Sequence, residues 1–315
     1  MKKVAVIEGG YSKEKAISIK SAKTVFDNLD RTMFDPIRVL IDEKEWTSYD
    51  EEGRYPIDKN DFSFIKNGSK NNFDYAFIVI HGTPGEDGKL QGYLDMVGVP
   101  YNTSSAAITA LTFQKFHCNQ FLKNYGLNVP EAVLIKPEDV INERQTIEKV
   151  KLPCFVKPTD GGSSYGVTKV KKDNELLLAI KEAFRHGSEV IVEENIEGRE
   201  VTCGVFRDKQ RIKALPVTEI ISENEFFDYD AKYNGNSKEI TPAELEEKTT
   251  IKIQSLTKEI YGILGMKGIV RIDYIISKEN IPYLIEINSV PGMSKESIIP
   301  QMVKKQKTSI QTILL

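Results

Sequence analysis

The sequence predicts an α/β protein, α+β overall, that begins with a parallel α/β domain. In the first hundred of the 315 residues, strand-like apolar runs alternate with stretches of helical periodicity, which is the pattern of a parallel sheet covered by helices. The last third of the chain is richer in strand-like runs. A chain of this length can form two or three domains with substantial cores.

The N-terminal domain is expected to begin with the strand KVAVIE, followed by two glycines and a helix with apolar residues at helical spacing. Further strand-like runs are DPIRVLI, DYAFIVI and GVPYN, and a second amphipathic helix carries Leu90, Leu94 and Val97. A third helix, TFQKFHCNQFLKNYG, is expected to end at its glycine.

Downstream, the strands EAVLI, PCFVKP, GVTKV and EVIVEE are separated by a charged helix, a glycine-rich turn and the helix ELLLAIKEAF. The last third contains the strands EVTCGVF and IKALPVTEI, then a hairpin made of GIVRIDYII and IPYLIEIN, and SIQTILL reads as a final helix. The polar stretch ENEFFDYDAKYNGNSKEITP has no regular periodicity. A loop that long within a compact domain is usually functional or disordered.

Composition narrows the class of protein. With 40% hydrophobic and 28% charged residues and a formal net charge of −3, the chain is an ordinary globular protein without a basic field for nucleic acid. No apolar run approaches the roughly 18 residues that span a bilayer, and the apolar run before Glu8 is too short for a secretion signal. We therefore expect a cytoplasmic protein that binds neither nucleic acid nor membrane.

Three cysteines, odd in number and widely spaced, predict buried thiols: Cys118, Cys154 and Cys203.

The hairpin near the C-terminus carries the most informative polar residues. Because strand side chains alternate between faces, Arg271 and Asp273 share one face, as do Glu286 and Asn288. The opposite face carries three isoleucines that can join a core: Ile272, Ile285 and Ile287. Burying the charges unpaired would be costly, whereas oxygen ligands in small number suit Mg²⁺ held jointly with phosphate. The following segment, 289–297, offers backbone N–H groups to an anion or oxyanion, with a plain turn as the alternative.

A glycine-rich segment from Lys157 to Gly166 lies between two strands. Its glycines would let N–H groups converge on a phosphate, with hydroxyls from Ser163 and Ser164, but an ordinary hairpin turn explains it equally well. It is neither a Walker nor a Rossmann motif, because those join a strand to a helix. Lys115 and Lys157 lie beside apolar runs that would carry them toward a cleft, where lysine binds phosphate as a point charge; the alternative is a solvated surface position.

Three further segments have both a functional and a structural interpretation. Glu193, Glu194 and Glu200 bracket an inter-strand turn, where they would accept hydrogen bonds from adenine and ribose or simply form a charged turn. His81 directly follows a strand, at the sheet edge where open α/β sheets bind ligands, or else belongs to a tight turn. Glu14 lies near the start of the first helix, where a dipole contact alone would contribute about 0.3–1 kcal/mol.

Read together and in order, these segments resemble the D-alanine–D-alanine ligases of the ATP-grasp superfamily. The resemblance runs from GGYSKEKAISIKSA to PGMSKESIIP, nearly the whole chain, and includes HGTPGEDGKLQG, VKPTDGGSSYG, FFDYDAKY, RIDY and EINSVPGMS. It implies an N-terminal α/β substrate domain at residues 1–103, followed by an ATP-grasp fold of two subdomains at 104–193 and 194–315. The last of these would carry the metal and catalytic site.

The resemblance implies how ATP and metal would be bound. Lys115 and Lys157 would bind the phosphates, and the loop with Ser163 and Ser164 would close over them. Four residues would read the adenine and the ribose: Glu193, the Glu194 carbonyl, the Ile196 amide and Glu200. Two Mg²⁺ ions, replaceable by Mn²⁺, would be held by three residues: Asp273, Glu286 and Asn288.

The resemblance also implies how the amino acids would be bound. Glu14 would hold the ammonium of the first D-alanine, with His81 near its carboxylate. Ser297 and the Ile298 amide would bind the carboxylate of the second D-alanine. Two groups would stabilise the tetrahedral intermediate: Arg271 and the Gly292 amide.

Tyr233 carries the implied specificity. It would lie on a mobile loop, linked through Ser163 to Glu14, and Lys232 beside it would reach the γ-phosphate region. Family members that make D-alanyl-D-lactate lack this tyrosine, so its presence indicates the dipeptide.

The sequence departs from the usual family pattern at five positions outside the directly catalytic groups: Ala16, Asn102, Thr103, Gln114 and Tyr165.

The implied reaction is ATP-dependent ligation of two D-alanines through an acyl phosphate, releasing ADP and phosphate, for peptidoglycan precursor synthesis. Relatives are commonly dimers, so a homodimer is expected. Two alternatives stay open. One is an ATP-grasp ligase for another amino acid or hydroxy acid, and the other is a non-catalytic nucleotide-binding protein. ADP release that depends on D-alanine would distinguish a ligase from a non-catalytic nucleotide-binding protein.

Overall fold

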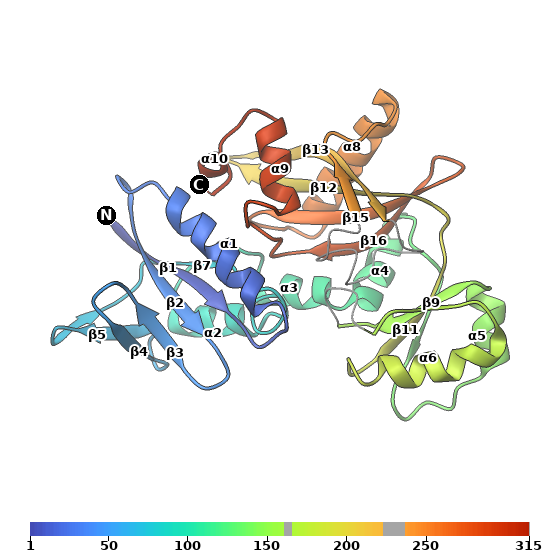
Figure 1. Cartoon of the computed structure of the whole chain (residues 1–315), viewed down its shortest axis with the longest axis horizontal. Coiled ribbons are helices and arrows are strands. Elements are labelled where there is room, and N and C mark those ends of the chain that lie inside the picture. Colours follow the sequence, from blue (N-terminus) through green and yellow to red (C-terminus); the bar gives the residue numbers. More distant parts are fainter. Residues whose placement is uncertain (161–165, 223–236, 315) are drawn as a thin grey trace.

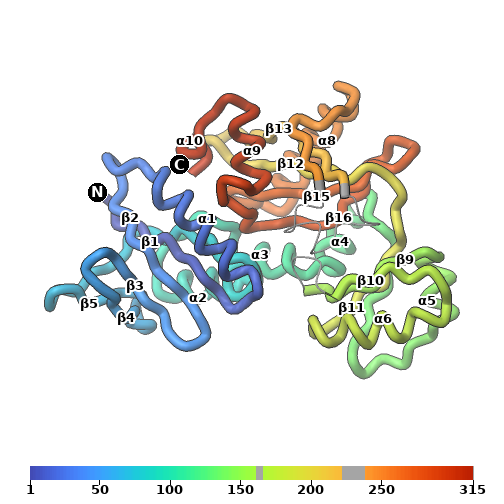
Figure 2. Tube along the Cα trace, in the orientation of Figure 1, coloured from blue at the N-terminus to red at the C-terminus, as the bar shows by residue number. Residues whose placement is uncertain are grey.

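The computed structural model describes residues 1–160, 166–222 and 237–314, and its strands form three sheets with helices packed around them (Figures 1 and 2). Four residues with predicted roles lie outside the described residues: Ser163, Ser164, Lys232 and Tyr233. None of the described helices is both long and apolar enough to cross a bilayer. The three cysteines are buried and free, as predicted.

The N-terminal sheet has the strand order β6-β5-β4-β3-β2-β1-β7. Its strands are β1 (Lys2–Gly9), β2 (Phe34–Ile41), β3 (Trp46–Tyr49), β4 (Arg54–Asp58), β5 (Ser63–Lys66), β6 (Ser69–Asn71) and β7 (Tyr75–Ile78). As predicted, β1 pairs in parallel with β2 and β7. From β2 to β6 the strands run antiparallel, which was not predicted. The predicted strand GVPYN is wrong, because only Tyr101 forms a bridge, to Ala76.

Two helices cover opposite faces of this sheet, α1 (Lys15–Asn28) and α2 (Lys89–Val97). Alternation along β1 explains the arrangement. Val4 and Val6 pack in one core cluster with α1, whereas Ala5 and Ile7 pack in another cluster with α2. Each face of β1 is therefore apolar, as expected of a parallel strand between two helical layers.

The second sheet is antiparallel, with the order β10-β9-β11-β8. Its elements are β8 (Ala132–Ile135), β9 (Cys154–Pro158), β10 (Thr168–Val170), β11 (Val190–Glu194), η1 (Asp173–Glu175), α5 (Glu143–Val150) and α6 (Leu176–Ala183). Val156 and Val192 pack with α5 and α6 in one core cluster. Because side chains alternate, Phe155, Lys157 and Glu193 lie on the opposite face, where Phe155 and Glu193 are register partners.

The third sheet has the order β14-β13-β12-β15-β16 and is antiparallel throughout. Its elements are β12 (Gly198–Asp208), β13 (Arg211–Ser222), β14 (Ser237–Ile240), β15 (Val270–Ser277), β16 (Pro282–Asn288), α8 (Glu247–Ile263), α9 (Ile298–Lys305) and α10 (Ile310–Leu314). β14 lies within the stretch expected to be a loop without regular structure, so that prediction is wrong for Ser237–Ile240.

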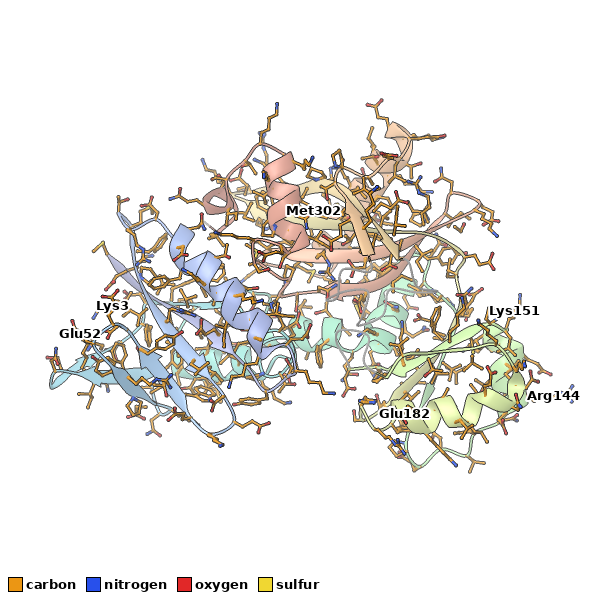
Figure 3. The ribbon with its side chains drawn as sticks, in the orientation of Figure 1. Lys3, Glu52, Arg144, Lys151, Glu182 and Met302 are labelled. Atoms are coloured by element: carbon orange, nitrogen blue, oxygen red, sulfur yellow. The ribbon has the colours of Figure 1, made fainter. Side chains whose placement is uncertain are left out.

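One core cluster joins the N-terminal and third sheets. Phe206 and Leu215 of the third sheet share it with Val25 of α1, Val79 after β7, and Met302 of α9. In Figure 1, α9 and α10 accordingly lie beside α1, and Figure 3 labels Met302 on α9. Segments almost 300 residues apart thus bury a common surface.

Two helices, α3 (Ala106–Phe113) and α4 (Lys115–Lys123), stand where one helix from Thr112 to Gly126 was predicted. The prediction is wrong because Gln114, with φ −91° and ψ 88°, leaves the helical region and separates them. Cys118 and Leu122 of α4 pack in the core cluster that also contains Val270 and Ile272 of the third sheet. The domain boundaries given above remain predictions.

Candidate active site

The four polar residues of the C-terminal hairpin meet on one face of β15 and β16. The register pairs Arg271 with Asn288 and Asp273 with Glu286. Nε and Nη2 of Arg271 each donate to a carboxylate oxygen of Asp273 at 2.9 Å, and Nδ2 of Asn288 donates to Asp273 Oδ2 at 2.9 Å. Asp273 is only 7% exposed, so these bonds replace its lost hydration.

Thr202 is a contact that sequence reasoning missed. Its Oγ1 donates to Asp273 Oδ1 at 2.5 Å from the neighbouring strand β12. The strand register places Thr202 directly opposite Asp273. The sequence alone does not indicate which strand pairs with β15. With Arg271 and Asn288, this hydroxyl holds the carboxylate from three directions.

The predicted hairpin is wrong in one detail, because it contains a bulge between Asp273 and Tyr274. Asp273 pairs with Glu286 and Tyr274 pairs with Leu284, so Ile285 has no register partner. Ile272 and Ile287 join the buried cluster as predicted, but Ile285 does not. Its carbonyl instead accepts a hydrogen bond from Asn119 Nδ2 on α4 at 3.1 Å.

The charges of the hairpin are mutually compensated. Burial alone would lower the pKa of the Arg271 guanidinium, but Asp273 and then Glu286 outweigh it and raise that pKa above its ordinary value. Glu286 Oε2 lies 3.4 Å from Lys115 Nζ. Two cations, Arg271 of the hairpin and Lys115 of α4, therefore lie beside the two carboxylates.

The donor set on this face fits Mg²⁺. Asp273 and Glu286 offer carboxylate oxygens and Asn288 a carboxamide oxygen, and Mg²⁺ takes oxygen ligands from few protein groups while keeping waters and phosphate. Across residues 1–160, 166–222 and 237–314 no three His, Cys, Asp or Glu side chains are grouped to hold a metal ion; the predicted set has only two besides its carboxamide.

The second sheet carries the residues predicted to bind nucleotide. Lys157 Nζ donates to Glu193 Oε1 at 2.6 Å, and both side chains are buried. Glu194 is tied to the start of β8, because its N–H donates to Glu131 O at 2.8 Å and its Oε2 accepts from Glu131 N at 3.1 Å. Ile196 follows in the connection to β12, and Glu200 lies on β12 itself.

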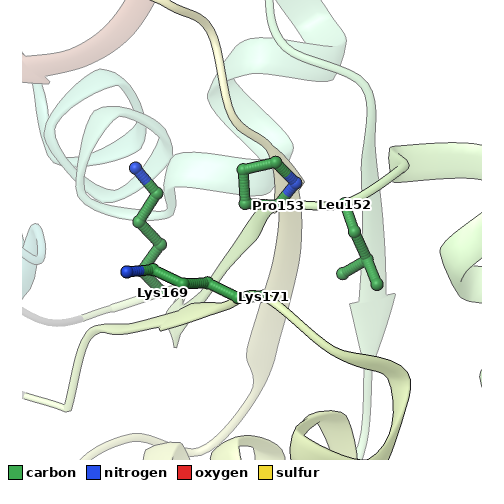
Figure 4. A pocket seen from close by; sticks show the side chains of 4 residues that line it. All are labelled: Leu152, Pro153, Lys169 and Lys171. Atoms are coloured by element: carbon green, nitrogen blue, oxygen red, sulfur yellow. The ribbon is translucent and has the colours of Figure 1, made fainter.

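A pocket opens at the outer end of this sheet, lined by Leu152, Pro153, Lys169 and Lys171 (Figure 4). Lys169 is the register partner of Phe155 and therefore lies on the face that carries Lys157. Its Nζ lies 5.5 Å from the centroid of the Phe155 ring. An aromatic ring with a cation over it thus borders the predicted adenine site.

His81 links the N-terminal domain to the loop after β16. Its Nδ1 is 2.8 Å from Val290 O, and its Nε2 is 3.4 Å from Ser21 Oγ. Burial, opposed by the charge of Glu14, lowers the pKa of His81, so the ring is neutral near pH 7. A neutral ring donates from Nδ1 to Val290 O and accepts at Nε2 from Ser21, whose Oγ in turn accepts from Met293 N at 3.0 Å.

Glu86 makes the matching contact on the same residue, and it was not among the predicted site residues. Its Oε1 accepts from Val290 N at 3.2 Å and its Oε2 from Gly82 N at 2.7 Å. Burial, followed by the nearby charge of Glu14, raises the pKa of Glu86 to about 8. Both backbone groups of Val290 are therefore held from the N-terminal domain, which brings Glu14, His81 and Glu86 to the hairpin's end.

The loop after the hairpin brings Gly292 against Ser297. A Cβ at Gly292 would lie 2.8 Å from Ser297 Oγ, so the close approach requires glycine there. Ser297 is the N-cap residue of α9, its Oγ lies 2.9 Å from Ser294 Oγ, and Ile298 begins the helix. The backbone N–H groups of this turn lie at the N-terminus of α9, a position that favours anions.

One departure from the family pattern has a clear structural role. Asn102 stands beside the end of β7, where its Oδ1 accepts from Ile78 N at 2.7 Å and its Nδ2 donates to Ile78 O at 3.3 Å. The carboxamide thus completes the edge of the sheet as a neighbouring peptide would.

Comparison with known proteins matches both parts of the chain. Family models described as D-ala D-ala ligase N-terminus and D-ala D-ala ligase C-terminus match residues 3–104 and 121–314. The D-alanine–D-alanine ligase of Azobacteroides pseudotrichonymphae is 47% identical, over 100% of this chain and 98% of that protein.

Solved structures share the whole fold. The D-Ala:D-Ser ligase VanG of Enterococcus faecalis is 32% identical with a TM-score of 0.87, covering 99% of this chain and 97% of that one. The D-alanine–D-alanine ligase of Bacillus anthracis, solved with ATP, is 26% identical with a TM-score of 0.80, covering 100% and 95%. These likenesses confirm the predicted fold class. The chain belongs to the D-alanine–D-alanine ligase family.

Proposed function

We propose that this chain joins two D-alanines into D-alanyl-D-alanine at the expense of ATP, releasing ADP and phosphate, and so supplies a peptidoglycan precursor. The observation that carries the proposal is the hairpin face, where Arg271 meets Asp273, Asn288 and the Lys115–Glu286 pair. A protein that only bound nucleotide would have no need of a partly buried guanidinium beside this donor set. That ATP is the nucleotide follows from the family and from the ATP complex of the Bacillus anthracis relative.

In the first step, the carboxylate of one D-alanine would attack the γ-phosphoryl group and form an acyl phosphate. This chemistry depends on positioning and on neutralising charge. Lys115 and Lys157 would turn from their carboxylate partners to the phosphates, while Glu14 would hold the ammonium and His81 would lie near the reacting carboxylate. Glu193, Glu194, Ile196 and Glu200 would hold the adenine and ribose.

In the second step, the amine of the other D-alanine, deprotonated near Tyr233 and Ser163, would attack the acyl carbonyl and displace phosphate. Arg271 and the Gly292 amide would stabilise the oxyanion that develops, and Ser297 with the Ile298 amide would hold the incoming carboxylate. Tyr233, Ser163, Ser164 and Lys232 would complete the closed site and exclude water, to which an acyl phosphate is sensitive.

Asp273, Glu286 and Asn288 would hold two Mg²⁺ ions, for which Mn²⁺ would substitute. Bound there, the ions would neutralise charge on the phosphate groups. The geometry on which this rests is the shared face of the hairpin, where Asp273 contacts Arg271, Glu286 lies beside Lys115, and Asn288 contacts Asp273.

We also propose a homodimer in the cytoplasm, with the substrate domain at residues 1–103 and the two ATP-grasp subdomains at 104–193 and 194–315. Sedimentation velocity at two protein concentrations tests the oligomeric state: a species of twice the chain mass supports the dimer, and a single-chain species at both concentrations contradicts it.

The experiment that tests the proposed function measures ADP release with ATP and Mg²⁺, supplying D-alanine, L-alanine or D-serine in separate reactions. We expect release that depends on D-alanine and is absent with L-alanine. ATP binding without release in any of these reactions would support a non-catalytic nucleotide-binding protein instead. Release with neither alanine but with another D-amino acid would keep the reaction class and change the substrate.

A further inference from the structure

Thr159 is a buried residue to which the proposed reaction gives no role. It lies just beyond β9, is completely buried, and follows Lys157 by two residues. On its other side the chain continues to the glycines and serines of the segment 157–166. Thr159 therefore stands between two elements that are predicted to bind the phosphates of ATP.

All three polar groups of Thr159 are hydrogen-bonded to other elements. Its N–H donates to Glu189 O at 3.0 Å, and its carbonyl accepts from Lys115 N at 3.0 Å. Its Oγ1 accepts from Phe116 N at 3.3 Å. The last two bonds satisfy the first two N–H groups of α4, which have no partner within the helix.

Thr159 thus caps α4 from outside the helix. Gln114, the N-cap residue, makes no side-chain cap bond, so the acceptors come from the end of β9. A helix start that is held at two successive N–H groups has a fixed direction. Because Lys115 is the first residue of α4, this direction sets where its side chain begins.

The contact also joins two separate cores. α4 packs with the third sheet through Cys118 and Leu122. β9 packs with the second sheet through Cys154 and Val156. Lys115 therefore belongs to the body that carries Glu286, and Lys157 to the body that carries Glu193. Thr159 lies where the two bodies meet and fixes one lysine relative to the other.

Neighbouring contacts fix the ends of the glycine-rich segment at the same place. Asp160 Oδ2 accepts from Ser188 Oγ at 3.0 Å. A Cβ at Gly166, which has φ +70°, would lie 2.9 Å from the His186 ring. Together with Glu189, which accepts from Thr159, these residues show that segment 186–189 supports both ends.

We infer that Thr159 is a positioning residue for the triphosphate: its hydroxyl and carbonyl hold the start of α4 so that Lys115 and Lys157 face the same phosphates. The inference rests on the proposed function in that both lysines bind ATP. It adds a residue that touches neither ATP nor metal and acts through Lys115.

The test compares Thr159→Val, which keeps the shape and removes the acceptor, with Thr159→Ser, which keeps the acceptor. Thr146→Val is the matched control, because Thr146 is a buried threonine of α5 in the same body, remote from α4. Isothermal titration with Mg²⁺ and β,γ-imido-ATP measures triphosphate affinity, and titration with adenosine measures binding of the base and ribose alone.

We expect Thr159→Val to weaken binding of the triphosphate analogue by about five- to tenfold, the effect of one lost hydrogen bond. Adenosine affinity should stay within about twofold, and Thr159→Ser and Thr146→Val should behave like the parent protein. An unchanged affinity of Thr159→Val for the analogue would overturn the inference. So would an equal loss for adenosine, since that indicates general loosening of the nucleotide site.

Steady-state kinetics separate this inference from the proposed function. In Thr159→Val the KM for ATP should rise with the KM for D-alanine unchanged. If the parent protein binds the analogue but forms no dipeptide, the proposed function fails while the titrations still decide the role of Thr159. A parent protein that binds no analogue would overturn both.

Discussion

At the scale of the residue, Arg271 is the group on which the proposed chemistry depends most. Its guanidinium is partly buried and forms two parallel hydrogen bonds with Asp273, a geometry that lysine cannot reproduce. The same carboxylate also accepts from Thr202 and Asn288. Asp273 would therefore keep two hydrogen-bond donors if Arg271 turned from it to the reacting groups.

Replacing Arg271 with alanine should nearly abolish turnover and leave the fold intact. Loss of one donor to a developing oxyanion lowers kcat by about 10²–10³-fold, and Thr202 and Asn288 still satisfy Asp273. Steady-state ADP release and a thermal unfolding scan measure the two effects.

Arg199→Ala is the matched control. Arg199 forms a similar two-bond pair with Glu219 at 2.7 Å, and it lies on the opposite face of β12 from Glu200. This variant should lose stability and keep kcat. Substantial turnover in Arg271→Ala, or a kcat loss of the same size in Arg199→Ala, would contradict the assignment of Arg271.

Glu86 should make stability depend on pH. Its pKa of about 8 in the folded protein lies above the ordinary value of 4.5, so the folded state holds this proton more tightly. The contribution of the protonated Glu86 carboxyl to the free energy of unfolding is therefore fully present below pH 4.5. It is lost as pH rises through about 8.

In Glu86→Gln the free energy of unfolding, measured by urea titration, should therefore decline less over this range than in the parent protein. Glu138→Gln, at an exposed position, should keep the parent slope. Parallel pH profiles for the parent and Glu86→Gln would show that Glu86 does not carry the effect.

At this scale the sequence indicated the residues of the hairpin but not their partners. Period-two alternation was enough to place Arg271 and Asp273 on one face. Thr202 and Glu86 were missed because each acts through a contact with a residue at least 70 positions away. Only the fold determines such contacts, and neither residue type is unusual in its local sequence.

At the scale of the element, the turns set the positions of the site. β1 ends in two glycines, and Gly9 has φ +99° with its position closed by Ile41 O, 2.4 Å from where a Cβ would lie. The chain thereby leaves β1 toward Glu14 at the start of α1. A side chain at Gly9 would have to move the end of β2.

Gly9→Ala should lower the free energy of unfolding by about 1–3 kcal/mol, through left-handed strain and the clash with Ile41. Gly53→Ala is the matched control, because a Cβ there meets nothing closer than 3.6 Å, the Tyr55 hydroxyl oxygen. Urea denaturation of both variants measures the difference. Equal stability of the two variants would contradict the strain argument.

Helices and long strands were predictable from their periodicity, whereas interruptions were not. Gln114 separates α3 from α4 although neither glycine nor proline stands there, because Thr159 supplies the cap from a distant strand. The strands β3 to β6 are short and largely polar, so no alternation distinguished them from loops.

At the scale of the whole molecule, the proposed site draws on all three sheets. Glu14, His81 and Glu86 lie in the N-terminal domain, and the second sheet carries Lys157 and Glu193. The hairpin belongs to the third sheet. The bonds of His81 and Glu86 to Val290 join the first of these to the last. The order of the sequence motifs was sufficient to indicate the family, but the contacts of His81 and Glu86 with Val290, and of Lys115 with Glu286, are properties of the fold.

The choice of the second substrate is a property of the whole enzyme. The solved relatives include a D-Ala:D-Ser ligase with the same fold, so fold alone does not select the second substrate. The selection is proposed to rest on Tyr233, together with Ser297 and the Ile298 amide. Their joint effect appears only in the product.

The most direct measurement is one reaction with ATP, Mg²⁺ and equimolar D-alanine, D-serine and D-lactate, with the products identified by mass. We predict D-alanyl-D-alanine as the main product, formed with one ADP for each dipeptide. D-alanyl-D-serine or D-alanyl-D-lactate as the main product, or no condensation product at all, would contradict the account.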